Sequence, residues 1–181
     1  EQEGIPSIGG YAIEDLFNVP VSPWPRLGAK GVFINLEGSE QANDAYVCEI
    51  PPGGAIEPQR HLFEAFIFVL KGRGATSLWQ PGGRKQSFEW GEGSLFAPPL
   101  NCHYQLFNGS GAEPARFLAM TTAPVIMNLF HNPDFVFKND FVFRDRYNGE
   151  QDFFDAEGTV HFKRLWESNF IPDVYTMKLL E

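Results

Sequence analysis

Short runs of alternating residues, bounded by glycine and proline, are the main pattern of this chain, and they are typical of β-strands. The clearest run is AFIFVLK, in which Ala65, Ile67 and Val69 share one face of a strand. The opposite face, which begins with Phe66, is apolar as well. A strand that is apolar on both faces needs cover on both. We therefore predict that its Phe-rich face packs against the N-terminal arm or against a second copy, and that the protein is a homodimer.

The same pattern predicts eight strands and an all-β fold. Their expected bounds are residues 31–36, 44–50, 65–71, 75–80, 85–90, 94–97, 103–107 and 115–121. Turns at Pro81-Gly82-Gly83 and Gly91-Glu92-Gly93 connect the middle of this series as a meander. Eight short strands suit a small closed barrel or a jelly roll.

The composition changes on both sides of residues 46–123, which we assign to the core of the barrel. Residues 1–45 are predicted to form an N-terminal arm and the first strand, and residues 124–181 a C-terminal extension that packs on the barrel. Within the arm, residues 13–17 are expected to be helical. Within the extension, the near repeat of DFVFKN and DFVFRD predicts a hairpin or two consecutive edge segments.

Charge and cysteine content exclude several classes of partner. The chain has 14 Lys and Arg against 23 Asp and Glu, a formal net charge of -9, and its basic residues are scattered. We therefore expect no binding to nucleic acid or to an anionic membrane. The apolar runs are also shorter than the ~18 residues that suggest a membrane span. The two cysteines, Cys48 and Cys102, form no disulfide framework, which favours a cytoplasmic setting.

Two segments of the predicted barrel keep a recognisable spacing of glycine, proline and asparagine. They run from Gly53 to Gly72 (GGAIEPQRHLFEAFIFVLKG) and from Gly93 to Asn108 (GSLFAPPLNCHYQLFN). This spacing resembles the motifs G-x5-H-x-H-x3-E-x6-G and G-x5-P-x-G-x2-H-x3-N of the cupin superfamily. The resemblance covers about residues 46–121 and implies a cupin-type jelly-roll β-barrel with a metal site in its interior. At Asn101 the family has glycine, an exchange that a left-handed turn tolerates.

Most of the metal ligands implied by this resemblance are missing. The first motif has Gln59, His61 and Ala65 where the family has His, His and Glu, and the second has Tyr104 where the family has His. A mononuclear site needs three or four N, O or S ligands, and the loss of the carboxylate weakens it. We therefore expect no bound metal.

Two alternatives would keep one divalent ion, namely Fe, Mn, Ni or Zn. In the first, the ion binds to His61, Gln59 and Tyr104. In the second, a shift of the register brings in Glu64 and His103. Strand alternation turns these last two side chains away from the interior unless a bulge re-aims them.

The preferred functional hypothesis is a barrel that binds a small carbonyl, carboxylate or aromatic molecule. His61 and Tyr104 would transfer protons in a metal-independent isomerase or lyase, because imidazole titrates near neutral pH and a phenol donates to a carbonyl or enolate oxygen. The side chains expected to contact the ligand are Gln59, Ala65, Ile67, Phe96 and Trp79. The alternatives are a metal-dependent oxygenase of small aromatic or keto acids, which the resemblance implies, and a ligand-binding module without turnover.

Overall fold

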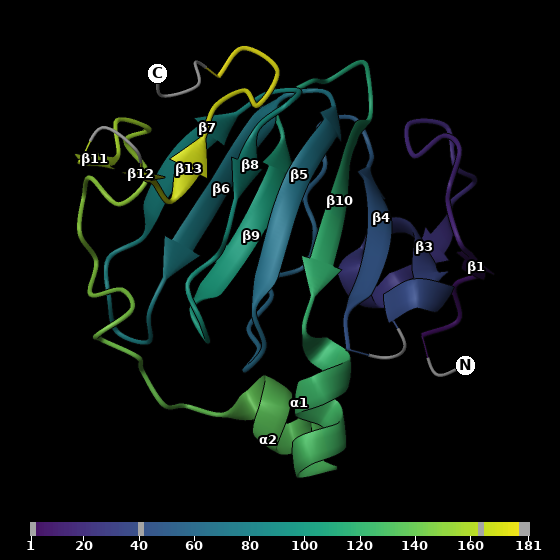
Figure 1. Ribbon diagram of the computed structural model, residues 1–181, viewed down its shortest axis with the longest axis horizontal. Coiled ribbons are helices and arrows are strands. Elements are labelled where there is room, and N and C mark those ends of the chain that lie inside the picture. The colour runs from purple at the N-terminus through teal and green to yellow at the C-terminus, as the bar shows by residue number, and fades with distance from the viewer. Residues whose placement is uncertain (1–2, 40–41, 163–164, 178–181) are drawn as a thin grey trace.

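The structure is a computed structural model that describes residues 3–39, 42–162 and 165–177. Two sheets pack against each other around a common core (Figure 1). The large sheet has the order β1 (Ser7–Gly10), β3 (Ala29–Leu36), β4 (Asp44–Ile50), β10 (Ala115–Thr121), β5 (Ala65–Lys71), β8 (Leu95–Phe96) and β13 (Phe170–Ile171), and β2 (Ser22–Trp24) pairs with β3. The small sheet has the order β7 (Gln86–Trp90), β6 (Gly74–Trp79) and β9 (His103–Asn108).

A few short elements complete the described chain. They are the pair β11 (Thr159–His161) and β12 (Leu165–Glu167), the helices α1 (Ala123–Phe130) and α2 (Pro133–Lys138), and the 3-10 turns η1 (Pro25–Leu27) and η2 (Glu37–Ser39). None of the helices among the described residues has the length and hydrophobicity required to cross a membrane. The predicted all-β jelly-roll architecture is confirmed. Three strands, β4, β5 and β10, have the bounds expected from the sequence.

The strands β5 and β10 occupy the centre of the large sheet and supply the inner layer of the core. Their alternation turns Ile67, Val69 and Phe117 inward, where they are buried against Leu78 of β6 and Leu106 of β9. Each fully buried side chain of this size contributes about 1.5–3 kcal/mol of transfer free energy. Burial between the two sheets therefore fixes the register of β5, and with it the direction of every residue in the first motif.

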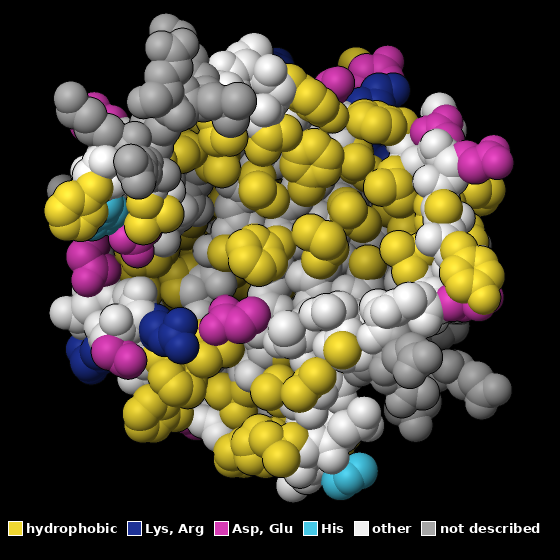
Figure 2. Space-filling model, viewed as in Figure 1, with side chains coloured by type: hydrophobic (Ala, Val, Ile, Leu, Met, Phe, Trp, Pro, Cys, Tyr) yellow, Lys and Arg dark blue, Asp and Glu magenta, His cyan; other side chains and the backbone are white. Residues whose placement is uncertain are grey.

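The outer face of the large sheet is also apolar, as the sequence indicates, but the N-terminal arm covers only part of it. Val19 of the arm is buried with Val32, Val47 and Leu70 of β3, β4 and β5. Phe66, on the same outer face of β5, remains 52% exposed. Figure 2 shows hydrophobic side chains gathered over β5 and β10 on the face that is turned toward the viewer in Figure 1.

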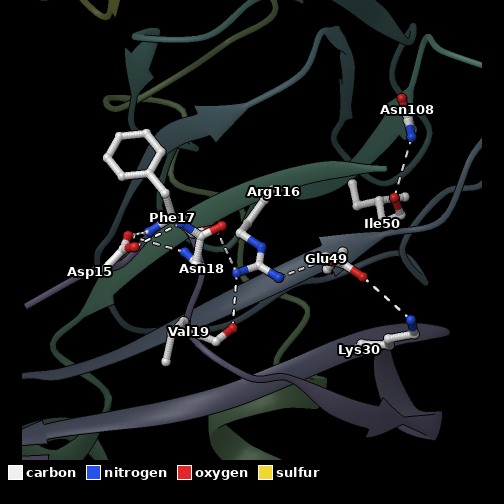
Figure 3. Close-up of polar contacts among 9 residues, drawn as sticks. All are labelled: Asp15, Phe17, Asn18, Val19, Lys30, Glu49, Ile50, Asn108 and Arg116. Carbon is white, nitrogen blue, oxygen red and sulfur yellow. Dashed lines mark hydrogen bonds and ion pairs between the residues drawn. The ribbon is translucent and has the colours of Figure 1, made fainter. Parts of the chain in front are cut away.

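In addition to the pairing of β1 and β2 with β3, Arg116 of β10 attaches the arm to the sheet (Figure 3). Arg116 donates from Nη1 to the carbonyl oxygens of Phe17 and Val19, at 2.8 and 2.9 Å, and from Nη2 to Oε2 of Glu49 at 2.6 Å. The Arg116 and Glu49 side chains are only 12% and 15% exposed. Burial protects this charge-assisted contact from solvent, so it contributes more than an ion pair at the surface does.

The expected helix at residues 13–17 is not formed. Instead, the carboxylate of Asp15 accepts hydrogen bonds from the backbone nitrogens of Phe17 and Asn18, at 2.9 and 3.2 Å, and from the Asn18 side chain at 2.7 Å. Such a turn, closed by an aspartate side chain, competes with helix formation and leaves the Phe17 carbonyl free to accept from Arg116.

The interpretation of the DFVF repeat as strands was also wrong. Its first copy forms α2, because Asn132 caps the helix by accepting from the Phe135 backbone nitrogen at 3.1 Å and Pro133 begins the first turn. An ion pair between Asp134 and Lys138, one turn apart, adds to this. Local capping thus outweighs the strand preference of Phe and Val, whereas the second copy has no regular structure.

Two groups of contacts that hold the extension on the barrel lie near the start and near the end of its described part. At one end, Leu62 donates its backbone N–H to the carbonyl of Val136, which is fully buried in α2. The Asn101 side chain, on a residue whose φ is 55°, donates to the carbonyls of Asn139 and Phe141 at 2.9 and 2.8 Å. On the large sheet, β13 adds to β8 and buries Phe170 in the core. The division at residue 123 stays a prediction.

We expect Arg116→Ala to lower the free energy of unfolding by about 2–4 kcal/mol, because it removes the shorter and more buried of the two cationic contacts of Glu49 and leaves two carbonyl groups without their donor. Lys30→Ala is the matched control, since Lys30 contacts the same Glu49 at 3.4 Å but its side chain is 55% exposed. The control should cost less than about 1 kcal/mol. Urea unfolding of the three proteins measures the difference, and equal losses in the two variants would contradict this account of the arm.

Candidate functional site

The centre of the candidate site is a hydrogen bond between His61, in the segment before β5, and Tyr104 of β9. Backbone hydrogen bonds in both directions between Gln59 and Tyr104, at 2.9 and 3.0 Å, hold this segment against β9. The Nε2 atom of His61 lies 2.9 Å from the Tyr104 hydroxyl, and Nδ1 lies 2.8 Å from the carbonyl oxygen of Phe63. A carbonyl oxygen can only accept, so Nδ1 carries the proton, and Nε2 accepts from the Tyr104 hydroxyl.

Both members of this pair are uncharged at neutral pH. Burial lowers the pKa of His61 to about 4, and the positive charge of Arg26 acts in the same direction, while the Phe63 carbonyl opposes it. Burial also raises the pKa of the Tyr104 hydroxyl. The pair is therefore a neutral imidazole with a free acceptor nitrogen, held next to a phenol that keeps its proton.

Aromatic rings enclose the imidazole. The ring of Phe63 stacks on His61 with 3.8 Å between centroids and an interplanar angle of 3°. Phe137 of α2 meets the edge of Phe63 at 5.8 Å. Sequence reasoning missed both rings. The two-residue spacing of His61 and Phe63 was a usable signal, whereas Phe137 lies in a segment that was expected to be extended.

Three of the five expected ligand-contacting residues lie inside the barrel. Ala65, Ile67 and Phe96 are all buried, and Ile67 and Phe96 belong to the same core cluster as Tyr104. Trp79 lies elsewhere, because Leu78 is the residue of β6 that turns inward. The Trp79 indole stacks on His103 at 5.3 Å and lies 4.1 Å below the ammonium group of Lys85, outside the barrel.

Gln59 is tied to the mouth of the barrel by its side chain. Its amide oxygen accepts from Nη1 of Arg26 at 3.1 Å, and its amide nitrogen donates to the carbonyls of Glu57 and Pro58 at 2.8 and 3.2 Å. Arg26 is held in turn by Glu3, at 2.7 Å. Sequence reasoning missed Arg26, because the Pro-rich arm has no periodicity from which its direction could be inferred.

Glu64 and His103 point away from the interior, as strand alternation predicts. Glu64 lies 3.7 Å from Arg146 and its side chain is 46% exposed, while His103 contacts Trp79 on the outside. A register shift in the pairing of β10 with β5 lies at Arg116, at the opposite end of β5 from Glu64. This bulge therefore does not re-aim the carboxylate into the barrel.

The residues at the motif positions do not fit a divalent metal ion. Ala65 has no donor atom, and the two polar groups of His61 and Tyr104 that face each other are bonded to one another. The amide of Gln59 is engaged at the mouth. Within residues 3–39, 42–162 and 165–177, no three His, Cys, Asp or Glu side chains form a group that could hold a metal ion. The chemistry open to this site is therefore that of a neutral hydrogen-bonded pair in apolar surroundings.

Comparison with known proteins relates this chain to a fold. No family model matches the sequence, and no curated protein matches it. Among solved structures, a Lactobacillus farciminis oxalate decarboxylase in complex with formate is 20% identical, with a TM-score of 0.50 over 58% of this chain and 31% of that one. The cupin domain of Schizosaccharomyces pombe Cnp3 is 18% identical, with a TM-score of 0.48 over 59% and 66%. Hazelnut (Corylus avellana) vicilin is 17% identical, with a TM-score of 0.47 over 52% and 28%.

The matched region therefore spans about a third of the length of the decarboxylase. Identities this low report on architecture and leave the reaction open. The spacing of the two motifs, the order of the strands and the packing of the two sheets all agree with a jelly-roll barrel. This chain has the cupin fold.

Proposed function

We propose that the barrel binds a small organic molecule with a carbonyl group at the His61–Tyr104 pair and moves a proton on it without a metal ion. The observation that carries this proposal is the 2.9 Å hydrogen bond between these residues, with a defined tautomer, among apolar side chains. Ligand sites typically combine an apolar lining with a few convergent polar groups, and strongly shifted pKa values often mark them.

The pair suits proton transfer beside a carbonyl. With a ligand bound, Tyr104 redirects its hydroxyl hydrogen from His61 to the carbonyl oxygen, which gains negative charge in the transition state. Nε2 of His61 then takes a proton from the carbon next to the carbonyl. Returning the same proton to a different carbon of the same molecule completes an isomerisation, so no electrons are gained or lost. His61 is already neutral at pH 7 and needs no prior deprotonation.

A cleft of about 450 Å³ at the mouth of the barrel is the proposed route to the pair. It is lined by Gln59 and His103, which lie close in sequence to His61 and Tyr104, and by Phe137 and the cations Arg26 and Arg60. Its volume is within the range that small ligands occupy. For a ligand to reach the pair from this cleft, the Gln59 side chain must move or the rings of Phe63 and Phe137 must separate.

The second candidate is a binding module without turnover. The observation that favours it is the burial of the pair, since His61 is 8% and Tyr104 2% exposed among equally buried side chains. In this case the pair acts only in recognition, and the ligand leaves unchanged. The metal-dependent oxygenase receives no such support, because the donor set does not fit an ion. A cytoplasmic setting stays a prediction that rests on Cys48 and Cys102, both free and buried.

We expect the protein to catalyse hydrogen–deuterium exchange next to the carbonyl group of its ligand in D2O. NMR with a panel of ketones, aldehydes and 2-oxo acids measures this rate. Tyr104→Phe should lower it by about 10²–10³-fold, because the oxyanion loses its donor. His61→Gln should lower it by about 10²–10⁴-fold, because the base is removed.

Trp79→Phe is the matched aromatic control, since Trp79 lies outside the barrel, and it should leave the exchange rate unchanged. A ligand that raises the melting temperature but is recovered without deuterium would select the binding module instead. Exchange that persists at full rate in both the His61 and Tyr104 variants would contradict the assignment of the pair.

The pKa of His61 also has a consequence for stability. In the folded protein it is about 4, below the value of about 6.5 for an unperturbed histidine. Between these two pH values the unfolded chain binds a proton at this residue and the folded chain does not. The free energy of unfolding therefore falls as the pH is lowered from 6.5 to 4, by roughly 3 kcal/mol from His61 alone.

We expect His61→Gln to remove this contribution. Denaturant unfolding of the wild type and the variant at pH 7 and pH 4.5 measures the change for each protein, and the difference between the two changes isolates His61 from the other titrating groups. The variant should show the smaller loss at pH 4.5. Parallel losses in the two proteins would mean that the buried imidazole is not neutral.

A further inference from the structure

Part of the outer face of the large sheet is apolar and exposed. Met120 of β10 pairs with Phe66 of β5, and Leu118 with Phe68, so these four side chains form one continuous surface. Phe66 is 52% and Met120 44% exposed. Tyr175 extends the surface, because its ring contacts Phe68 with 6.3 Å between centroids and it is 64% exposed. We call these five residues the open face.

The N-terminal arm lies on the same outer face of the sheet, but it covers other strands and leaves the open face bare. Arg116 and the burial of Val19 against Val47 and Leu70 hold the arm over β3, β4 and the far end of β5. Phe68 and Leu118 only border this cluster, and Phe66 and Met120 lie beyond it. The arm and the open face thus divide the outer surface of the sheet between them.

Two charged residues next to the open face are paired within the chain. Its five residues carry no formal charge, Glu64 at the start of β5 lies 3.7 Å from Arg146, and Arg116 on β10 is bound to Glu49. Figure 2 shows acidic and basic side chains mostly around the margin of this surface. A strongly charged partner finds no complementary charge here. A second copy, which has the same net charge of -9, can approach through this neutral surface without facing like charges.

The size of the open face matches the centre of a dimer interface. A large buried side chain covers about 150–250 Å², so Phe66, Met120 and Tyr175, at 52%, 44% and 64% exposure, together present roughly 300 Å² of surface. A standard interface buries about 800 Å² on each partner, with an apolar core inside a polar rim. The open face supplies such a core, and the charged margin supplies a rim.

We propose that two copies of this chain associate through their open faces, with the two large sheets packed face to face about 10 Å apart. The open face lies on the side of the sheet opposite to the His61–Tyr104 pair, so this proposal is independent of the proposed function. Because the interface is the same patch on both copies, each open-face residue occurs in it two times, once from each copy.

Sedimentation velocity from 1 to 100 µM measures the association directly. We expect the wild type to sediment as a dimer, and we expect Phe66→Glu to raise the dimer dissociation constant at least tenfold by placing a charge in each copy of the interface. Met120→Lys is the second variant, with the opposite charge, and tests the same surface if Phe66→Glu does not fold. Circular dichroism checks that each variant keeps its secondary structure.

Phe141→Glu is the matched control. Phe141 is 61% exposed and lines a different apolar cleft of about 510 Å³, together with Leu62, Leu100, Phe130, Phe135, Asn139 and Phe143. It should leave the dimer intact. A monomeric wild type at 100 µM, a dimer that survives both open-face substitutions, or a dimer lost only in Phe141→Glu would each overturn the proposal.

Discussion

Burial of the inner faces of β5 and β10 against the small sheet is the constraint on which the rest of the structure depends. Because Ile67, Val69 and Phe117 must face the small sheet, the register of both strands is fixed along their length. That register places Ala65 inside and Glu64 outside. The outward direction of Glu64 and the apolar outer surface are thus two results of the same packing requirement.

The architecture could be predicted from the sequence because its signal is local and repeated. Alternation gave the bounds of β4, β5 and β10, and the spacing of glycine and proline aligned both motifs. Helix α2 could not be found in this way, because capping by Asn132 and Pro133 decides its conformation against the preference of its Phe and Val residues. The turn closed by Asp15 shows the same limit in the arm.

The candidate site could be predicted only in part. Motif spacing identified His61 and Tyr104 as a candidate pair, and the backbone bridge between Gln59 and Tyr104 holds the two side chains within hydrogen-bonding distance. Arg26 could not be identified, since it reaches Gln59 from 33 positions away through an arm without periodic structure. Its positive charge supports the neutral state of the imidazole, so a residue outside both motifs helps to set the chemistry inside the barrel.

Asn101 is a departure from the cupin motif that also helps to attach the C-terminal extension. It occupies a left-handed turn where the family has glycine, and glycine has no side chain with which to donate to Asn139 and Phe141. The exchange therefore costs little in the turn and gains two anchors for the segment that follows α2. In related sequences, we expect asparagine at this position to occur together with a helix that covers His61, as α2 does here. We expect glycine to occur where this helix is absent.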